Sequence, residues 1–86
     1  MKEHEVIDII KAHNESIDNY INGELAERLH AKGGKIEMNQ WFEAQRLIKE
    51  QDFYGKGREL QKKMRAEGFD VKMDMQANKL VYKWYR

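Results

Sequence analysis

The chain has 86 residues, of which 36% are charged and 41% hydrophobic, a composition typical of one small globular domain rather than of a disordered chain. It contains no cysteine, which excludes disulfides, thiolate metal sites and cysteine nucleophiles and favours a reducing compartment. The opening Met1-Lys2-Glu3-His4-Glu5 is charged at once, and no apolar run approaches the ~20 residues that cross a bilayer. We therefore expect no signal peptide, no membrane span and a cytoplasmic protein.

The net charge of +1 conceals an asymmetry between the two parts of the chain. Residues 1–54 hold seven Lys and Arg against eleven Asp and Glu, whereas residues 55–86 hold nine against four. The net charges are therefore −4 and +5. This asymmetry predicts an acidic partner for the basic part, or an attraction between the two parts within one monomer or across a dimer.

Apolar residues recur every three or four positions from residue 3 to residue 31 and predict a long amphipathic helix. The stripe consists of Val6, Ile10, His13, Ile17, Tyr20, Ile21, Leu25 and Leu29. Because glycine costs about 1 kcal/mol inside a helix, Asn22-Gly23 marks either a weak joint in one helix or a bend between two. Gly33-Gly34 is expected to end the segment. The stripe is also a candidate dimer seam.

Two shorter helices are predicted in the middle of the chain. Ile36-Glu37-Met38 alternates and predicts a short bridge of strand, and Asn39 is a good N-cap for a helix over 40–51. The apolar stripe of that helix loses its phase after Ile48. A new stripe begins at Phe53, and Gly55 and Gly57 bracket a lysine at this break. We therefore predict a turn over 52–57 and a third helix over 57–67, which Gly68 ends.

The C-terminal residues predict an antiparallel β-hairpin. Residues 69–75 and 80–85 both alternate between apolar and polar side chains with a period of two. A turn centred on Ala77-Asn78, with Asn78 at positive φ, would bring three apolar pairs to one face. These pairs are Met75 with Leu80, Met73 with Tyr82, and Val71 with Trp84.

The residues do not predict a catalytic, metal or cofactor site. His4 and Asp8 lie four positions apart on a helix, but a third metal ligand at a compatible spacing is missing, and His13 lies within the apolar stripe. Ser16 is the only serine and has no strand-turn-helix elbow around it. We therefore predict that the protein is not an enzyme and needs no cofactor.

The third predicted helix carries a basic ridge that is suited to nucleic acid. Arg58, Lys62 and Arg65 are spaced four and three apart with Gln61 on the same side, as a helix entering a major groove requires. Lys56 lies between two glycines whose backbone N–H groups could meet a phosphate. On the outer face of the hairpin the predicted register places Lys72 opposite Lys83, with Lys79 at the tip.

The order helix, short strand, helix, turn, helix, hairpin resembles a winged helix-turn-helix domain over residues 36–85. The run from Leu60 to Val71 (LQKKMRAEGFDV) resembles the end of that family's recognition helix entering its wing, and Leu80-Val81-Tyr82 resembles the returning strand. The resemblance implies that Arg58, Gln61, Lys62 and Arg65 read DNA. It also implies that Lys72, Lys79 and Lys83 contact phosphates.

Together these patterns predict a single α+β domain: a long N-terminal helix over 1–32, then a helix-turn-helix and hairpin over 36–86, winged-helix-like. The first functional hypothesis is a small DNA-binding protein in transcription regulation, with a homodimer as its candidate assembly. The alternative is an inhibitor or adaptor that binds a larger protein through its hairpin or its acidic N-terminal helix. The acidic row of that helix contains Glu3, Asp8, Glu15, Asp18, Glu24 and Glu27.

Overall fold

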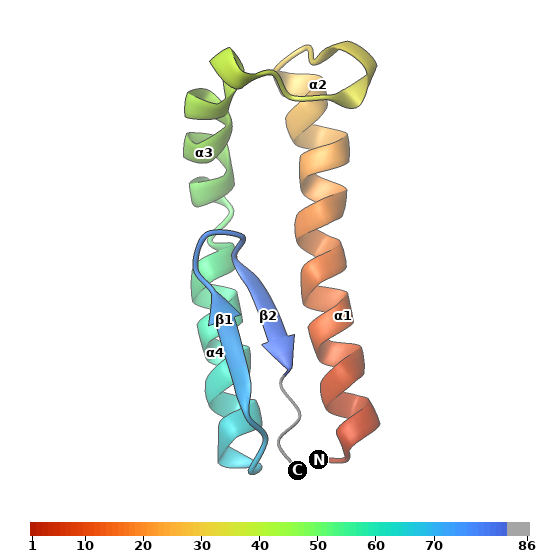
Figure 1. Cartoon of the computed structure of the whole chain (residues 1–86), viewed down its shortest axis with the longest axis vertical. Coiled ribbons are helices and arrows are strands. Elements are labelled where there is room, and N and C mark those ends of the chain that lie inside the picture. The colour runs from red at the N-terminus through yellow and green to blue at the C-terminus, as the bar shows by residue number, and fades with distance from the viewer. Residues whose placement is uncertain (83–86) are drawn as a thin grey trace.

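The computed structural model, which describes residues 1–82, is a rod of 43 × 19 × 19 Å made of two helical arms and a hairpin (Figure 1). The first arm comprises α1 (Glu3–Tyr20), a π-helical segment (Ile21–Leu25) and α2 (Ala26–Arg28). The returning arm comprises α3 (Trp41–Glu50) and α4 (Phe53–Ala66), and the hairpin comprises β1 (Val71–Asp74) and β2 (Lys79–Tyr82). The predicted α+β class with a C-terminal antiparallel hairpin is confirmed.

The first arm is continuous because a π-helical turn absorbs the Asn22-Gly23 interruption. A π-helical turn accommodates one extra residue without breaking the helix, and this keeps Ile17 and Leu25 on the same buried side. The predicted stripe is buried within the monomer, against the returning arm and the hairpin. It is therefore not available as the dimer seam that the sequence suggested.

Gly23 lies in this π-helical turn, and a Cβ added to it would meet no atom within 4 Å. We expect Gly23→Ala to raise the free energy of unfolding by about 0.5–1 kcal/mol, because alanine loses less backbone entropy in a helix. Urea denaturation followed by circular dichroism measures this change. A loss of stability would show that the turn needs the freedom of glycine.

The first arm ends at His30, before the predicted stop at Gly33-Gly34. His30 takes the left-handed conformation with φ +51°. The N–H groups of Ala31 and His30 donate to the carbonyls of Ala26 and Glu27 over 3.0 and 3.1 Å. This is the Schellman pattern that satisfies the last carbonyls of a helix, with histidine in the place usually taken by glycine.

The connection to α3 differs from its prediction in two respects. Residues 36–38 form no strand; a 3₁₀ turn (Met38–Gln40) begins there instead. Asn39 lies inside that turn, and Glu37 takes the N-cap position. Gln40 decides this geometry, because its Oε1 accepts from the Glu37 N–H at 3.2 Å while its Nε2 donates to the Leu29 carbonyl at 2.6 Å.

The second predicted helix is confirmed as α3, but the third begins four residues earlier than predicted. The turn is limited to Gln51-Asp52, where Asp52 has φ +52° and its Oδ1 accepts from the Gly55 N–H at 3.2 Å. Gly55 and Gly57 are helical. Gly57 lets α4 lie close to the side chains of Met73 and His13, because a Cβ there would be 2.5 Å from Met73 Cε and 3.2 Å from His13 Nε2.

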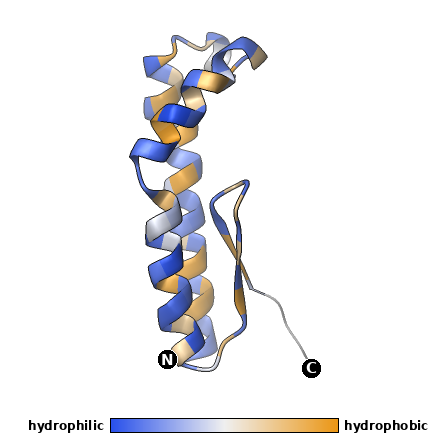
Figure 2. Ribbon diagram, turned by 90° about the vertical axis from the view of Figure 1, so that its left-hand side faces the viewer, coloured by the Kyte–Doolittle hydropathy of each residue, from blue (hydrophilic) through white to orange (hydrophobic). Residues whose placement is uncertain are grey.

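The α3 and α4 helices follow one another along the first arm and bend at the Gln51-Asp52 turn (Figures 1 and 2). This arrangement departs from a helix-turn-helix unit, whose two helices cross at about 90–120°. The hairpin lies against one side of the helical pair, beside α4 and the first half of α1 (Figure 2).

Two hydrophobic clusters fill the rod. One joins α1 and the π-helical segment to α3 and the start of α4, and it contains Ile17, Tyr20, Leu25, Ala44, Leu47 and Phe53. The other joins α1, α4 and the hairpin, and it contains Val6, Ile10, Met64, Val71 and Leu80. The hairpin therefore belongs to only one of the two clusters.

The hairpin forms with the predicted face but with a different register. Val71 pairs with Tyr82 and Met73 with Leu80, so the predicted pairs are displaced by two residues. The loop has four residues, because Asp74 Oδ1 accepts from the N–H groups of Gln76 and Ala77 at 3.0 and 3.2 Å. Asn78 has the expected positive φ, +58°. A shift of two preserves the face, so among the residues of that face within 1–82 only Met75 moves from the expected core to solvent.

Candidate nucleic-acid interface

The outer face of α4 carries most of the exposed positive charge of the C-terminal part. Five cations lie between Phe53 and Ala66 against one carboxylate, Glu59. All are exposed: Lys56, Arg58, Lys62, Lys63 and Arg65. Because Phe53, Gly57 and Met64 face the interior, these cations occupy the remaining, solvent-exposed sides of the helix.

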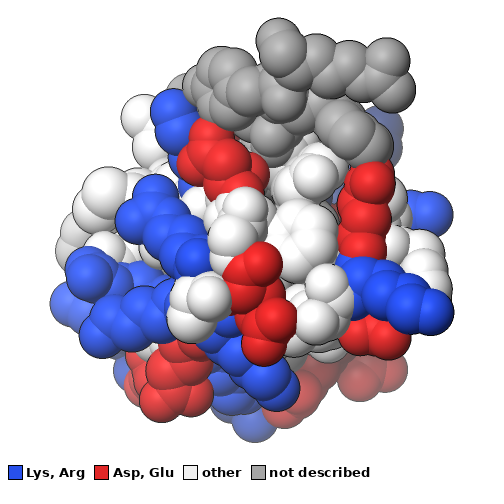
Figure 3. Space-filling model, turned by 90° about the horizontal axis from the view of Figure 1, so that it is seen from below, with Lys and Arg blue, Asp and Glu red and all other residues white. Residues whose placement is uncertain are grey.

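The α4 cations divide into two rows. Arg58, Lys62 and Arg65, spaced four and three apart, form the row that we call the basic ridge. Lys56 and Lys63 are seven apart and line a groove between α4 and α1. Figure 3, which views the rod from the end where α1 begins, shows Lys and Arg gathered on the side of α4, with carboxylates among them.

Tyr54 supports the first residue of the basic ridge. The Arg58 guanidinium lies 5.8 Å from the centre of the Tyr54 ring, and its Nη1 donates to the Tyr54 hydroxyl at 3.2 Å. Stacking of this kind restrains a long side chain without neutralising its charge. Arg58 is therefore partly ordered before any ligand binds.

The basic ridge is free of ion pairs within residues 1–82. The salt bridges there join other groups: Met1 to Glu67, Arg28 to Glu24, Arg46 to Glu43 and Glu50, and Lys79 to Asp18. Lys79–Asp18 is the one among them that joins a C-terminal cation to the acidic N-terminal helix. The attraction between the two parts of the chain is thus local, and it leaves the ridge unneutralised.

Two residues predicted to contact DNA hold the hairpin in place instead. Gln61 Nε2 donates to the Val71 carbonyl at 2.9 Å, and Lys79 Nζ lies 2.9 Å from Asp18 Oδ1. Both side chains are committed within the fold, so we remove them from the proposed DNA surface. The sequence placed Gln61 with the ridge, but its side chain turns toward β1.

The remaining predicted residue that the structure describes is Lys72. It is exposed on β1 and pairs with Val81, not with Lys83 as the predicted register had it. Because Gln61 ties β1 to α4, Lys72 lies on the strand beside the helix that bears the basic ridge. Lys83 lies outside the described residues, as do Trp84, Tyr85 and Arg86.

Sequence reasoning missed the polar contacts through which α1 holds the hairpin. Asn14 Nδ2 donates to the Leu80 carbonyl at 3.0 Å, and its Oδ1 accepts from the Leu80 N–H at 2.9 Å. His13, which lies within the predicted apolar stripe, is buried with its Nε2 at 2.9 Å from the Asn78 carbonyl. The sequence signal for these contacts was a pair of adjacent polar residues, a His and an Asn, on a helix with an otherwise apolar side.

Other chemistry is sparse over the described part of the chain. No three His, Asp or Glu side chains there lie close enough to hold a metal ion. The Ser16 hydroxyl donates to the Ala12 carbonyl at 3.0 Å. A hydrogen bond from Arg46 lowers the pKa of Glu43, and a hydrogen bond to Glu67 raises the pKa of the Met1 amino group. The groups whose pKa is shifted form exposed ion pairs away from the basic ridge.

The comparisons with known proteins give no identity. No family model, curated protein or solved structure matches this chain. The resemblance to winged helix-turn-helix domains therefore stays a prediction, and the function has to be inferred from the geometry of the chain itself. Among residues 1–82, no helix combines the length and the apolar composition that a membrane span needs.

Proposed function

We propose that this protein is a small, non-catalytic DNA-binding regulatory protein that contacts DNA through the basic ridge of α4, with Lys72 beside it. The observation that carries the proposal is the set of exposed cations on α4 that make no ion pair within residues 1–82. Fixed cations on a rigid helix bind phosphates by releasing condensed counterions. The absence of cysteine fits action in the cytoplasm.

The shape of α4 supports contact with duplex DNA. A helix of 14 residues is about 21 Å long, and the major groove, about 12 Å wide, admits one helix. The acidic residues of α1 would be repelled by phosphates, so the charge asymmetry orients the rod with α4 toward the DNA. Arg58 and Arg65 could also reach guanine edges, since bidentate arginine is the commonest specific contact.

The test is to neutralise the basic ridge and measure binding. We expect the combined substitutions Arg58→Gln, Lys62→Gln and Arg65→Gln to weaken binding to a mixed-sequence duplex at least about tenfold, because three phosphate contacts are lost. Fluorescence anisotropy at about 50 mM salt measures the affinity. Circular dichroism confirms that the variant is folded.

A matched control separates position from net charge. The control variant carries Lys32→Gln, Lys35→Gln and Lys49→Gln, which remove the same charge from exposed positions in the connecting loop and α3. This control should bind nearly as well as the wild type. Equal losses in the two triple variants would reject the basic ridge as the contact surface.

A protein-binding inhibitor or adaptor is the second candidate. Asp8, Glu15 and Glu27 remain exposed on the first arm and make no ion pair within the described chain, whereas Asp18 and Glu24 are paired. This acidic row supports contact with a basic protein surface. No shift of a mixed DNA pool at low salt, together with co-purification of one cellular protein, would favour this candidate over the first.

A further inference from the structure

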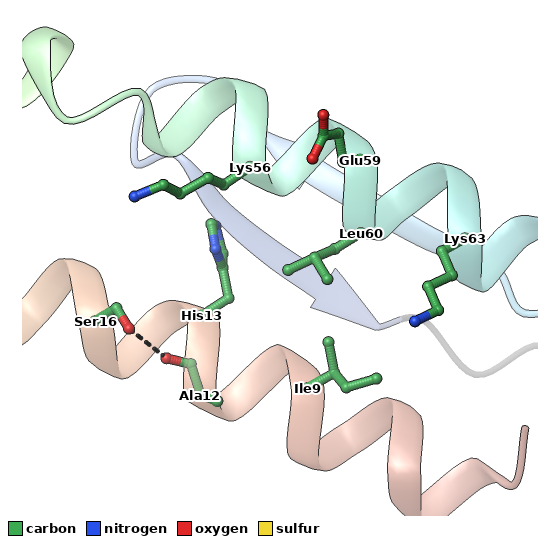
Figure 4. Close-up of a pocket in the computed structure, with 8 residues that line it drawn as sticks. All are labelled: Ile9, Ala12, His13, Ser16, Lys56, Glu59, Leu60 and Lys63. Carbon is green, nitrogen blue, oxygen red and sulfur yellow. Dashed lines mark hydrogen bonds between the residues drawn. The ribbon is translucent and has the colours of Figure 1, made fainter.

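A shallow groove runs between α1 and α4 on the side that the hairpin leaves open. Its volume is about 550 Å³, and its floor contains Ile9, Ala12 and Leu60 (Figure 4). Asn14 and Gln61 both bond to the hairpin, which places the hairpin on the other side of the helical pair. Ile9 and Leu60 are only half-buried, so this groove leaves apolar surface in contact with water.

The two edges of the groove carry opposite charges. The α4 edge carries Lys56 and Lys63, seven residues apart, with Glu59 between them. On α1, Glu5, Asp8, Ala12 and Glu15 follow one another at steps of three and four, which places them in one row beside the groove. The α1 edge is therefore acidic and the α4 edge is mainly basic.

The charges on the two edges lie at matching heights along the rod. His13 lies level with Gly57, where an added Cβ would be 3.2 Å from His13 Nε2. Met1 lies level with Glu67, since its amino group is 2.9 Å from Glu67 Oε2. Relative to these two fixed points, the antiparallel helices place Lys56 near the height of Glu15, and Lys63 between the heights of Glu5 and Asp8.

We propose that this groove is the interface of a homodimer in which a second copy packs face to face about a twofold axis parallel to the rod. Such an axis preserves height and exchanges the two edges. The α4 edge of each copy then faces the α1 edge of the other, Lys56 opposite Glu15 and Lys63 opposite Asp8. A twofold axis across the rod would instead bring the lysines of the two copies together.

Size and shape support the same occupant. The side of the rod that carries the groove extends over 43 by 19 Å, which is large enough to hold the ~800 Å² per partner of a standard protein interface. Ala12 and Ser16 are small, so another helix can approach α1 closely at these positions. The dimer would be a four-helix bundle with its hairpins outside, and the basic ridges would lie at opposite edges. The proposal does not depend on DNA binding.

Charge reversal tests the proposed pairing. Sedimentation of the wild-type chain at micromolar and higher concentrations should show a dimer. We expect each of two double variants to weaken self-association more than about tenfold, because like charges then face each other. One variant carries Lys56→Glu and Lys63→Glu, and the other carries Asp8→Lys and Glu15→Lys. Lys35→Glu, an exposed change elsewhere, should leave self-association unaltered.

Mixing the two reversed chains should restore dimers, because the reversed edge of each chain then faces an edge of opposite charge in the other. Cysteine cross-linking fixes the geometry, since the natural chain has none. A Lys63→Cys chain should cross-link with an Asp8→Cys chain and not with itself. A wild-type chain that stays monomeric, reversed chains that dimerise unchanged, or a mixture without heterodimer would overturn the proposal.

Discussion

Replacing Asn14 with alanine is expected to lower the free energy of unfolding by about 2–3 kcal/mol. The Asn14 amide makes both of its hydrogen bonds to the backbone of Leu80, at 2.9 and 3.0 Å. β2 is an edge strand, and one side chain of α1 satisfies its outward N–H and carbonyl as a neighbouring strand would. Alanine would leave both groups without partners under the first arm.

Urea denaturation measures this loss, and amide hydrogen exchange locates it. The Leu80 N–H should exchange faster in Asn14→Ala, whereas the amides of α3 should lose protection only as far as global stability falls. Asn19→Ala is the matched control, because Asn19 is exposed on the same helix. An Asn14→Ala protein as stable as the control would contradict the docking role of this side chain.

Leu80→Ala is expected to lower the free energy of unfolding by about 2–5 kcal/mol. Leu80 is 2% exposed and lies in the cluster that joins the hairpin to α1 and α4. Replacing its isobutyl side chain with a methyl group leaves a cavity among Val6, Met64 and Val71, which the helices cannot close without moving. For a domain with a stability of about 5–15 kcal/mol, this is a large fraction of the total.

Val81→Ala provides the comparison for Leu80→Ala. Val81 is the next residue of the same strand, points to the other face and is 41% exposed. Its truncation should change stability by about 0.5 kcal/mol or less. Thermal and urea denaturation of the two variants separate them, and equal losses would mean that the hairpin is not docked by its apolar face.

Periodicity predicted those parts of the fold that depend on which side of an element is buried. The stripe on α1, the position of α3 and the inward face of the hairpin follow from spacings of three to four or of two residues. The buried face of the hairpin was predicted correctly despite the incorrect register, because a displacement of two residues leaves each side chain on the same face of the strand.

The remaining features depend on individual side-chain contacts that the periodicity of the sequence does not show. Gly55 and Gly57 suggested a turn, but Asp52 caps the helix before them, and Gly57 is needed where Met73 and His13 approach. The sequence pattern placed Gln61 on the same helix face as the basic ridge, but its side chain donates a hydrogen bond to the Val71 carbonyl. At Gly57 and Gln61 a tertiary contact overrides a local preference, whereas the Asp52 cap is a local contact that the glycines obscured.

The salt dependence of DNA binding tests the central proposal most directly. The logarithm of the binding constant of the wild type should fall linearly and steeply with the logarithm of salt concentration between about 50 and 200 mM. The slope for Arg58→Gln, Lys62→Gln, Arg65→Gln should be shallower by about 2.7, since each phosphate contact contributes about 0.9. Parallel lines for the two proteins, or a wild-type chain that binds no duplex at about 50 mM salt, would contradict DNA binding through α4.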